Sequence, residues 1–283
     1  MVKATDFSSL AKRVSGVRDP NRDGVTRTPW GLAIHTTGGG VTDKARREGR
    51  RPIDVAIAEY IKSQNGSNRY PWGGPTYVMD HDGTLYQIAP DSILTHHSGG
   101  PHAADYRSGT WINQVSAATV QQWRKQWPNN QHPYTLFPGG SPNYGLVGLE
   151  MIPIGDGFGG KSMRPGLRFT TAQHNAVVAL ARDLAVRHRW PVGWNHTSRL
   201  LGHEDVDPIE RHDAGGGWDP GWLRAAPYFD FGYVRQRVGE TPATSSSHTG
   251  IKILAVAVGL VGLVGVGWLG RRLVDNSSLA RWA

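Results

Sequence analysis

Two histidines far apart in the chain could meet a carboxylate at a single site. His35 ends an apolar run that begins at Trp30, and a glycine-rich loop follows it, as expected where a buried strand opens toward solvent. His203 lies far downstream in a segment, residues 201–213, that is rich in Asp, Glu and His. Two imidazoles and one carboxylate can hold a catalytic zinc ion and leave its fourth position open for water. This combination indicates a metal-dependent hydrolase.

Strand and helix patterns predict the elements that would position these side chains. Short apolar runs and an Asp-Gly turn indicate strands and a hairpin, and apolar residues at helical spacing indicate helices, one of which starts at an N-cap threonine. The predicted strands are 30–35, 75–80, 84–88 and 144–152, and the predicted helices are 53–62, 115–126 and 170–189. Strands and helices mixed in this order imply an α/β domain over about residues 28–230.

Composition restricts both the site and its partners. The 283 residues include no cysteine, so a metal must be held by nitrogen and oxygen ligands and no disulfide can form. The formal net charge of +8 favours acidic partners such as nucleic acid, anionic lipid or a negatively charged cell wall. A solvated surface loop is the preferred explanation of the basic cluster at 44–51. Because no aromatic-interleaved nucleic-acid motif accompanies it, no specific nucleic acid is expected as a partner.

The carboxyl-terminal region predicts a single membrane anchor. From Ile253 to Gly270 the chain has 18 uncharged, mostly apolar residues, flanked by Lys252 and Arg271. As a helix this segment would span about 27 Å, close to the roughly 30 Å hydrocarbon core of a bilayer. A buried helix of a soluble domain is the alternative. The amino-terminal residues lack the apolar stretch of a secretory signal.

Five short motifs follow one another between residues 33 and 213. They are Ala33-Ile34-His35, the hairpin 76–86, His97-Ser98-Gly99, Val147-Gly148-Leu149-Glu150, and Gly202-His203 followed by Arg211-His212-Asp213. Together they resemble the zinc-dependent N-acetylmuramoyl-L-alanine amidases, a family shared by bacteriophage lysins, bacterial cell-wall amidases and peptidoglycan recognition proteins. The resemblance implies an α/β fold with a central mixed β-sheet flanked by helices. It also implies cleavage of the amide bond between N-acetylmuramic acid and the L-alanine of the peptidoglycan stem peptide.

The resemblance implies that His35, His203 and Asp213 bind zinc. Nine residues separate His203 from Asp213, which matches the family spacing between the second and third ligands. His212 is a rival third ligand, and Asp205 and Asp207 are weaker ones.

The resemblance also implies which residues act on the substrate. Glu150 corresponds to the catalytic acid/base, a role that a strand-borne carboxylate beside a zinc site can perform on chemical grounds alone. Arg211 stands where many bacterial and phage members carry a lysine that stabilises the oxyanion. Arginine keeps the positive charge and the hydrogen-bond donors, although a salt bridge within its loop is the alternative role. His97 and Tyr77 are expected to contact the substrate.

These interpretations divide the chain into an N-terminal extension (1–28), an amidase domain (29–232), a polar linker (233–250), the anchor (251–272) and a short tail (273–283). An anchored lysin without an export signal is expected to be phage-encoded and to act from a virion membrane or in the host cell envelope. Its expected partners are peptidoglycan, the membrane and other virion or membrane proteins. The alternatives are a module that binds peptidoglycan without cleaving it, and a structural viral membrane protein with an amidase-like fold.

Overall fold

The computed structural model describes ten stretches of the chain: 2–17, 24–37, 39–66, 72–98, 102–126, 132–137, 140–154, 168–191, 199–213 and 229–239. All of them belong to one unit of the fold, Met1–Thr241. The predicted anchor at 251–272 lies outside these stretches, as does most of the predicted linker. Within them, no helix combines the length and the apolar character needed to cross a bilayer.

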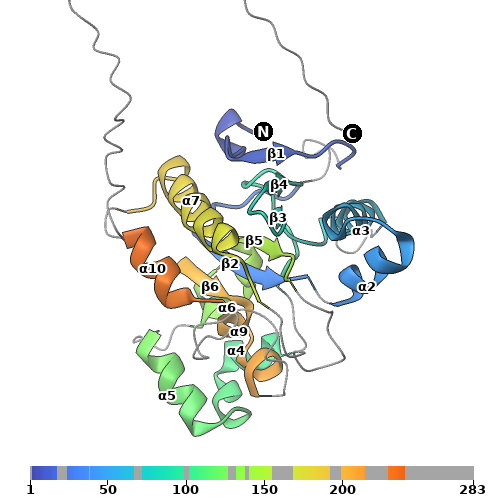
Figure 1. Ribbon diagram of the computed structural model, residues 1–283. Helices are drawn as coiled ribbons and strands as arrows, with labels where there is room; N and C mark the ends of the chain where they lie inside the picture. The colour runs from blue at the N-terminus through green and yellow to red at the C-terminus, as the bar shows by residue number, and fades with distance from the viewer. Residues whose placement is uncertain are drawn as a thin grey trace, which may run out of the picture. The chain divides into compact units, whose positions relative to one another are not determined.

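Six strands form a single mixed sheet in the order β1-β4-β3-β5-β2-β6 (Figure 1). The strands are β1 (Ala11–Arg13), β2 (Gly31–Thr36), β3 (Tyr77–Met79), β4 (Leu85–Gln87), β5 (Leu146–Met151) and β6 (Leu200–Gly202). Neighbouring strands pair in parallel, except β3 and β4, which are antiparallel. The prediction of a central mixed sheet is therefore confirmed.

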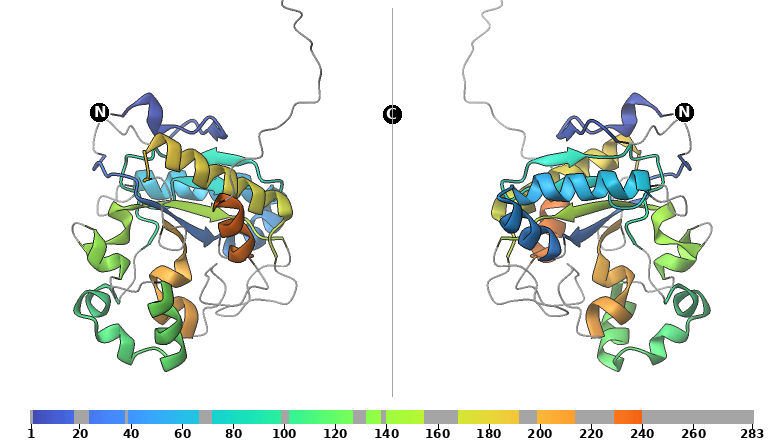
Figure 2. Two further views of the ribbon diagram at one scale, coloured as in Figure 1. Left: turned by 90° about the vertical axis from the view of Figure 1, so that its left-hand side faces the viewer. Right: turned by 90° about the vertical axis from the view of Figure 1, so that its right-hand side faces the viewer.

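Helices cover both faces of this sheet. The helices and helical turns are η1 (Ala4–Asp6), α2 (Gly39–Glu48), α3 (Pro52–Gly66), α4 (Ala103–Ser108), η2 (Thr110–Asn113), α5 (Ala117–Gln126), α6 (Pro133–Leu136), η4 (Pro142–Tyr144), α7 (Thr171–Arg187), α9 (His203–Val206), η5 (Ile209–Asp213) and α10 (Phe231–Gly239). Helices α7 and α10 pack on one face against Leu32 and Ile34 of β2 (Figure 2). On the opposite face, α3 covers Val78 of β3, and side chains from α4, α5 and α6 pack against Ala33 of β2.

Local signals in the sequence explain where two of these elements begin and turn. Helix α7 begins at the predicted N-cap, because the Thr170 side chain accepts a hydrogen bond from the Gln173 backbone and the Gln173 side chain accepts one from the Thr170 backbone. The hairpin between β3 and β4 turns at Gly83, whose φ of +82° favours glycine. A Cβ at Gly83 would also lie 2.8 Å from the carbonyl oxygen of Ala172 at the start of α7.

The amino-terminal residues contribute to the sheet, a role that the sequence left open. Strand β1 pairs in parallel with β4 at one edge. Arg27 is 7% exposed, and its guanidinium donates hydrogen bonds to the carbonyl oxygens of Asp91, Asn143 and Leu146. The segment before β2 is thereby tied to the core of the domain.

Candidate active site

Three neighbouring parallel strands bring the predicted site residues to one edge of the sheet. Strand β2 lies between β5 and β6, and the three run in the same direction. His35 pairs with Glu150 across β2 and β5, whereas Ile34 pairs with Gly202 across β2 and β6, so His203 follows directly beside His35. Open α/β sheets place their ligands at the carboxyl ends of parallel strands. Glu150 and the two histidines lie at such ends.

The imidazoles of His35 and His203 lie close together inside the protein. Their ring centroids are 4.3 Å apart, and the two residues are 2% and 5% exposed. The pKa of His35 is held well below its usual range, mainly by burial and further by the neighbouring His203, His97 and Arg211. His35 is therefore neutral at pH 7, and a neutral imidazole is the form that binds a metal ion.

His97 contacts the ring of His35. Its Nε2 lies 2.8 Å from the carbonyl oxygen of Leu146, and because a carbonyl can only accept, this nitrogen carries the proton. The Nδ1 atom is then an acceptor, and it lies 3.0 Å from Nε2 of His35 and 2.9 Å from Oγ of Ser98. The predicted substrate-contact residue thus lies at the site, where it also orients His35.

Gly148 provides the space that His97 occupies. A Cβ at Gly148 would lie 2.4 Å from Cγ of His97, so the imidazole lies directly on the strand. Side chains two residues apart on a strand point to the same face. Glu150, which is half-buried, therefore lies on the face that His97 covers, whereas Leu149 and Met151 enter the core on the other face.

Asn143 holds the His97 segment in place, a role that the sequence analysis missed. Its Oδ1 accepts hydrogen bonds from the backbone nitrogens of His97 (3.2 Å) and Ser98 (2.9 Å). Its Nδ2 donates to the carbonyl oxygen of Ser98 at 2.5 Å. The residue is 4% exposed. In the sequence it follows Ser-Pro and resembles an ordinary turn asparagine, so only the fold reveals this contact.

Comparison with known proteins assigns the family. The sequence matches the family model for N-acetylmuramoyl-L-alanine amidase over residues 25–222.

The chain belongs to this amidase family. No curated protein matches its sequence significantly. Two solved structures from Clostridium intestinale URNW match it at 14% identity. The endolysin N-acetylmuramoyl-L-alanine amidase LysCS has a TM-score of 0.37, over 83% of this chain and 99% of its own. The N-acetylmuramoyl-L-alanine amidase LysC has a TM-score of 0.35, over 76% of this chain and 88% of its own. At such scores the family assignment rests on the sequence match.

The segment after β6 carries the remaining predicted amidase positions. Asp213 ends the turn η5, and neither its side chain nor that of His212 is among the side chains that the structure describes. In the described part of the chain, no three His, Asp or Glu side chains gather as a metal site. The third ligand therefore stays a prediction, with Asp213 preferred and His212 as its rival.

Asp205 and Asp207, the weaker candidates for a third ligand, are occupied by structural contacts. Both are buried. Asp205 Oδ2 accepts a hydrogen bond from the backbone nitrogen of Gly202 at 2.7 Å, and Asp207 Oδ1 accepts one from the hydroxyl of Tyr106. These contacts hold the segment around His203. The second oxygen of Asp207, Oδ2, is buried and accepts no hydrogen bond from the described residues, so Asp207 stays a weaker candidate for the third ligand.

Arg211 places a positive charge near the histidines. Its side chain is 20% exposed, and its charge is one of the causes that lower the pKa of His35. Its Nη2 also lies 3.9 Å from Oε2 of Glu210, so the salt bridge considered as an alternative role coexists with this position.

Tyr77 does not lie where the predicted substrate contact requires. It is fully buried on β3, on the face of the sheet that α7 covers, whereas His97 lies on the opposite face. Its hydroxyl donates a 2.7 Å hydrogen bond to Asp91, and burial raises its pKa well above the usual range. The predicted role of Tyr77 does not fit this placement, and the residue belongs to the core.

Proposed function

We propose that this protein is a zinc-dependent hydrolase that cleaves the amide bond between N-acetylmuramic acid and the L-alanine of the peptidoglycan stem peptide. Membership of the N-acetylmuramoyl-L-alanine amidase family supports the amidase chemistry. The observation that carries the proposal is the position of Glu150, His35 and His203 at the ends of three adjacent parallel strands.

His35 and His203, with Asp213 as the predicted third ligand, would hold the zinc ion. The donor set fits zinc, because the two imidazoles are adjacent and buried, and burial keeps His35 neutral. Two histidines and a carboxylate also form a ligand set typical of zinc hydrolases. When bound, zinc supplies Lewis-acid polarisation of the scissile carbonyl and lowers the pKa of water.

Glu150 would move the protons of the reaction. Addition of water to the lactyl carbonyl forms a C–O bond, and cleavage of the C–N bond then releases the amine. The Glu150 carboxylate takes a proton from the attacking water and delivers it to the leaving nitrogen, so it ends the cycle ionised. The products are a lactyl carboxylate on the sugar and a free amino group on L-alanine.

Arg211 and His97 would support this chemistry in different ways. The permanent charge of Arg211 would stabilise the negative oxygen that develops as water adds to the carbonyl. The acceptor Nδ1 of His97 would keep the ring of His35 in one orientation.

We further propose that residues 251–272 anchor a phage-encoded lysin in a virion membrane or in the host cell envelope. The uncharged run from Ile253 to Gly270 supports the anchor. Flotation with phospholipid vesicles would test it, using the full chain and a chain that ends at residue 250. We expect only the full chain to float with the vesicles, and equal flotation of the two would refute the anchor.

Digestion of purified peptidoglycan tests the proposed activity. The full-length protein in detergent, loaded with zinc, should generate new amino-terminal L-alanine. Glu150→Gln should bind zinc as well as the wild type and release no L-alanine, whereas His203→Ala should lose the zinc as well. A wild-type protein that binds zinc and peptidoglycan without releasing L-alanine would favour a non-catalytic binding module or a structural viral membrane protein.

A further inference from the structure

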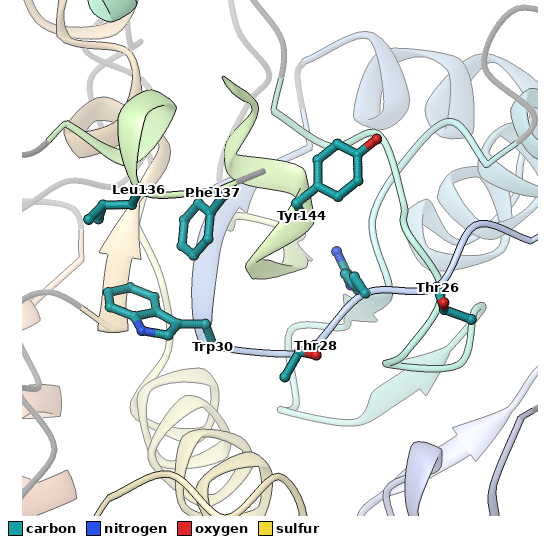
Figure 3. Close-up of a pocket in the computed structure, with 7 residues that line it drawn as sticks. Thr26, Thr28, Trp30, Leu136, Phe137 and Tyr144 are labelled. Carbon is teal, nitrogen blue, oxygen red and sulfur yellow. The ribbon is translucent and has the colours of Figure 1, made fainter. Parts of the chain in front are cut away.

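A hollow of about 470 Å³ lies beside the residues that precede β2, at the opposite end of this strand from His35. It is lined by Thr26, Arg27, Thr28, Trp30, Leu136, Phe137 and Tyr144 (Figure 3). Trp30 directly precedes β2, whereas His35 is near the end of that strand, so about 16 Å of extended chain separates them. The hollow is therefore distinct from the candidate active site.

Aromatic rings form the walls of this hollow, here called the aromatic hollow. Trp30 and Phe137 meet edge to face with their ring centroids 5.3 Å apart, and Tyr144 from η4 lies across from them (Figure 3). All three are half-buried, and Thr26 and Thr28 are exposed at its rim. Aromatic faces beside a few hydroxyl groups suit a sugar ring, which presents C–H groups on its faces and hydroxyls at its edge.

Buried hydrogen bonds fix these walls. Nη1 of Arg27 donates to the carbonyl oxygens of Asn143 (3.0 Å) and Leu146 (2.5 Å), and the backbone nitrogen of Trp30 donates to the carbonyl oxygen of Gly145 (2.7 Å). The segments that carry Trp30 and Tyr144 are thus locked together before any ligand arrives. Such preorganisation lowers the entropic cost of binding.

A second hollow of about 600 Å³, here called the basic hollow, adjoins the first across residues 26–28. Two of its lining side chains, Arg187 and His188, are bound to the buried carboxylate of Asp91. Two others, Lys3 and Arg189, form no ion pair within the stretches that the structure describes, and both are exposed. The basic hollow can therefore accept an anion.

Two details of the basic hollow agree with this interpretation. Its acidic lining residue, Asp6, is 4% exposed, and its Oδ2 accepts a 2.6 Å hydrogen bond from the backbone nitrogen of Lys3, so little of this carboxylate faces the hollow. Arg189 has a φ of +52°, the one positive value at a non-glycine residue in the described chain. It follows the end of α7, where glycine is favoured. Hydrogen bonds from the Arg189 nitrogen to the carbonyl oxygen of Val186 (3.3 Å) and from the Trp190 nitrogen to that of Ala185 (2.9 Å) close the helix in this conformation. The arginine side chain is thereby left exposed where it lines the basic hollow.

We propose that the aromatic and basic hollows form one exosite for glycan strands from which the stem peptides have been removed. The inference rests on the proposed function, since that hydrolysis converts each lactyl amide into a lactyl carboxylate. A sugar ring stacks in the aromatic hollow, and a lactyl carboxylate pairs with Lys3 and Arg189. Glycan that still carries stem peptides lacks this carboxylate. The exosite therefore holds the enzyme on strands that it has already processed, beside bonds that remain to be cleaved.

Calorimetric titration of the full-length Glu150→Gln protein separates binding from turnover. The probes are peptide-free glycan oligosaccharides bearing lactyl carboxylates and the tetramer of N-acetylglucosamine, which has similar rings without a carboxylate. When Tyr144→Ala is introduced into the Glu150→Gln protein, binding of both probes should weaken by about tenfold or more, as expected for loss of an aromatic anchor. When Arg189→Ala is introduced into the Glu150→Gln protein instead, only binding of the carboxylate-bearing probe should weaken.

Tyr233→Ala is the matched control, because Tyr233 is a half-buried tyrosine on α10, outside both hollows. It should leave both affinities unchanged. If Tyr144→Ala unfolds, Thr28→Trp at the exposed rim fills the aromatic hollow and should give the same loss. Undiminished binding by a folded variant with the hollow blocked, or no binding by the parent, would overturn the exosite.

Release of L-alanine by the wild type keeps this inference distinguishable from the proposed function. If the wild type releases L-alanine but glycan binding does not weaken in the Tyr144→Ala variant, the exosite alone is refuted. Tyr144-dependent and Arg189-dependent binding without release would refute the proposed hydrolysis alone.

Discussion

His35 on β2 and Glu150 on β5 are direct register partners in the parallel part of the sheet. Their backbones are held at the strand spacing of about 4.8 Å, and register partners point to the same face. The distance between the proposed zinc ligand and the proposed acid/base is thus set by the hydrogen bonds of the sheet. Functional groups on regular elements are held more accurately than groups on loops.

Glu150→Gln should remove the proton transfer and leave the fold intact. The amide has nearly the same shape as the carboxylate but cannot take up a proton, so we expect kcat for L-alanine release to fall by about 10²–10⁴-fold. The thermal midpoint should stay close to that of the wild type. Glu59→Gln is the control, because Glu59 is an exposed carboxylate on α3 that pairs with Lys44. Full activity of the Glu150 variant would remove this residue from the mechanism.

Gly148→Ala should displace the imidazole of His97, which packs against Gly148 of β5. The new Cβ would lie 2.4 Å from Cγ of His97, so the ring must leave the position in which its Nδ1 lies 3.0 Å from Nε2 of His35. We expect a loss of about 1–3 kcal/mol in the free energy of unfolding, as for other overpacked sites, together with a lower kcat. Urea unfolding and the rate of L-alanine release would measure the two effects.

Gly232→Ala provides the matched control for that substitution. Its new Cβ would meet one side-chain oxygen of Asp230 at 3.2 Å, and Gly232 lies within α10. Gly232 is the second residue of the helix, and the Asp230 oxygen accepts a hydrogen bond from the backbone nitrogen of Tyr233. The helix preference of alanine, about 1 kcal/mol in a helix interior, offsets this tight contact, so we expect stability close to that of the wild type and full activity. Equal behaviour of the two variants would contradict the packing role assigned to Gly148.

The sequence predicted the central elements and the amidase family because their signals are local. Apolar runs marked β2 and β5, the Asp-Gly turn marked the hairpin, and Thr170 marked the start of α7. The motif around His97 was also recognisable. In each case a few adjacent residues determine the outcome, and the structure and the family match confirm these elements and the family.

Contacts between distant segments could not be predicted in this way. The pairing of β1 with β4, the burial of Arg27 and the contact of Asn143 with the His97 segment each depend on residues far apart in the chain. Tyr77 shows the same limit, because a shift of one residue along a strand moves a side chain to the other face. The sequence placed it in the right strand without showing which face it occupies.

Asp91→Ala should destabilise the domain strongly. Asp91 is fully buried and accepts hydrogen bonds from Tyr77, Arg187 and His188. Removing the carboxylate takes one of its two ion-pair partners from Arg187, which keeps Asp183, and leaves the buried hydroxyl of Tyr77 without its acceptor. Each lost buried hydrogen bond typically costs about 1–3 kcal/mol. The free energy of unfolding in urea would measure the loss.

Asp54→Ala serves as the comparison for that loss. Asp54 pairs with Arg51 on an exposed part of α3, where solvent screens the interaction. We therefore expect a far smaller effect than at Asp91. If the two variants lost similar stability, the buried contacts of Asp91 would not be the cause.

His132 should make the stability of the domain depend on pH. The residue is 1% exposed, and its ring stacks between Tyr106 (centroids 4.1 Å apart) and Trp123 (5.2 Å). Burial holds the pKa of His132 well below its usual range. Below the usual pKa of about 6.5 the unfolded chain therefore binds a proton that the folded chain excludes. Stability is highest above that pH and falls as the pH is lowered, by up to about 1.4 kcal/mol per pH unit for one such histidine.

His132→Asn removes this titration and can keep the local hydrogen bond. Nδ1 of His132 accepts from the backbone nitrogen of Tyr134 at the start of α6, and an asparagine oxygen can do the same. Urea unfolding between pH 8 and pH 5 should show a shallower decline for the variant. At pH 8 the imidazole is neutral in both the folded and the unfolded chain. The difference in the free energy of unfolding between the wild type and the variant at this pH therefore measures the lost ring packing alone. His35 and His97, whose pKa values burial also lowers, titrate in both proteins and cancel in the comparison. If the free energy of unfolding fell with pH at the same slope in both proteins, His132 would bind its proton equally well in the folded and unfolded chain.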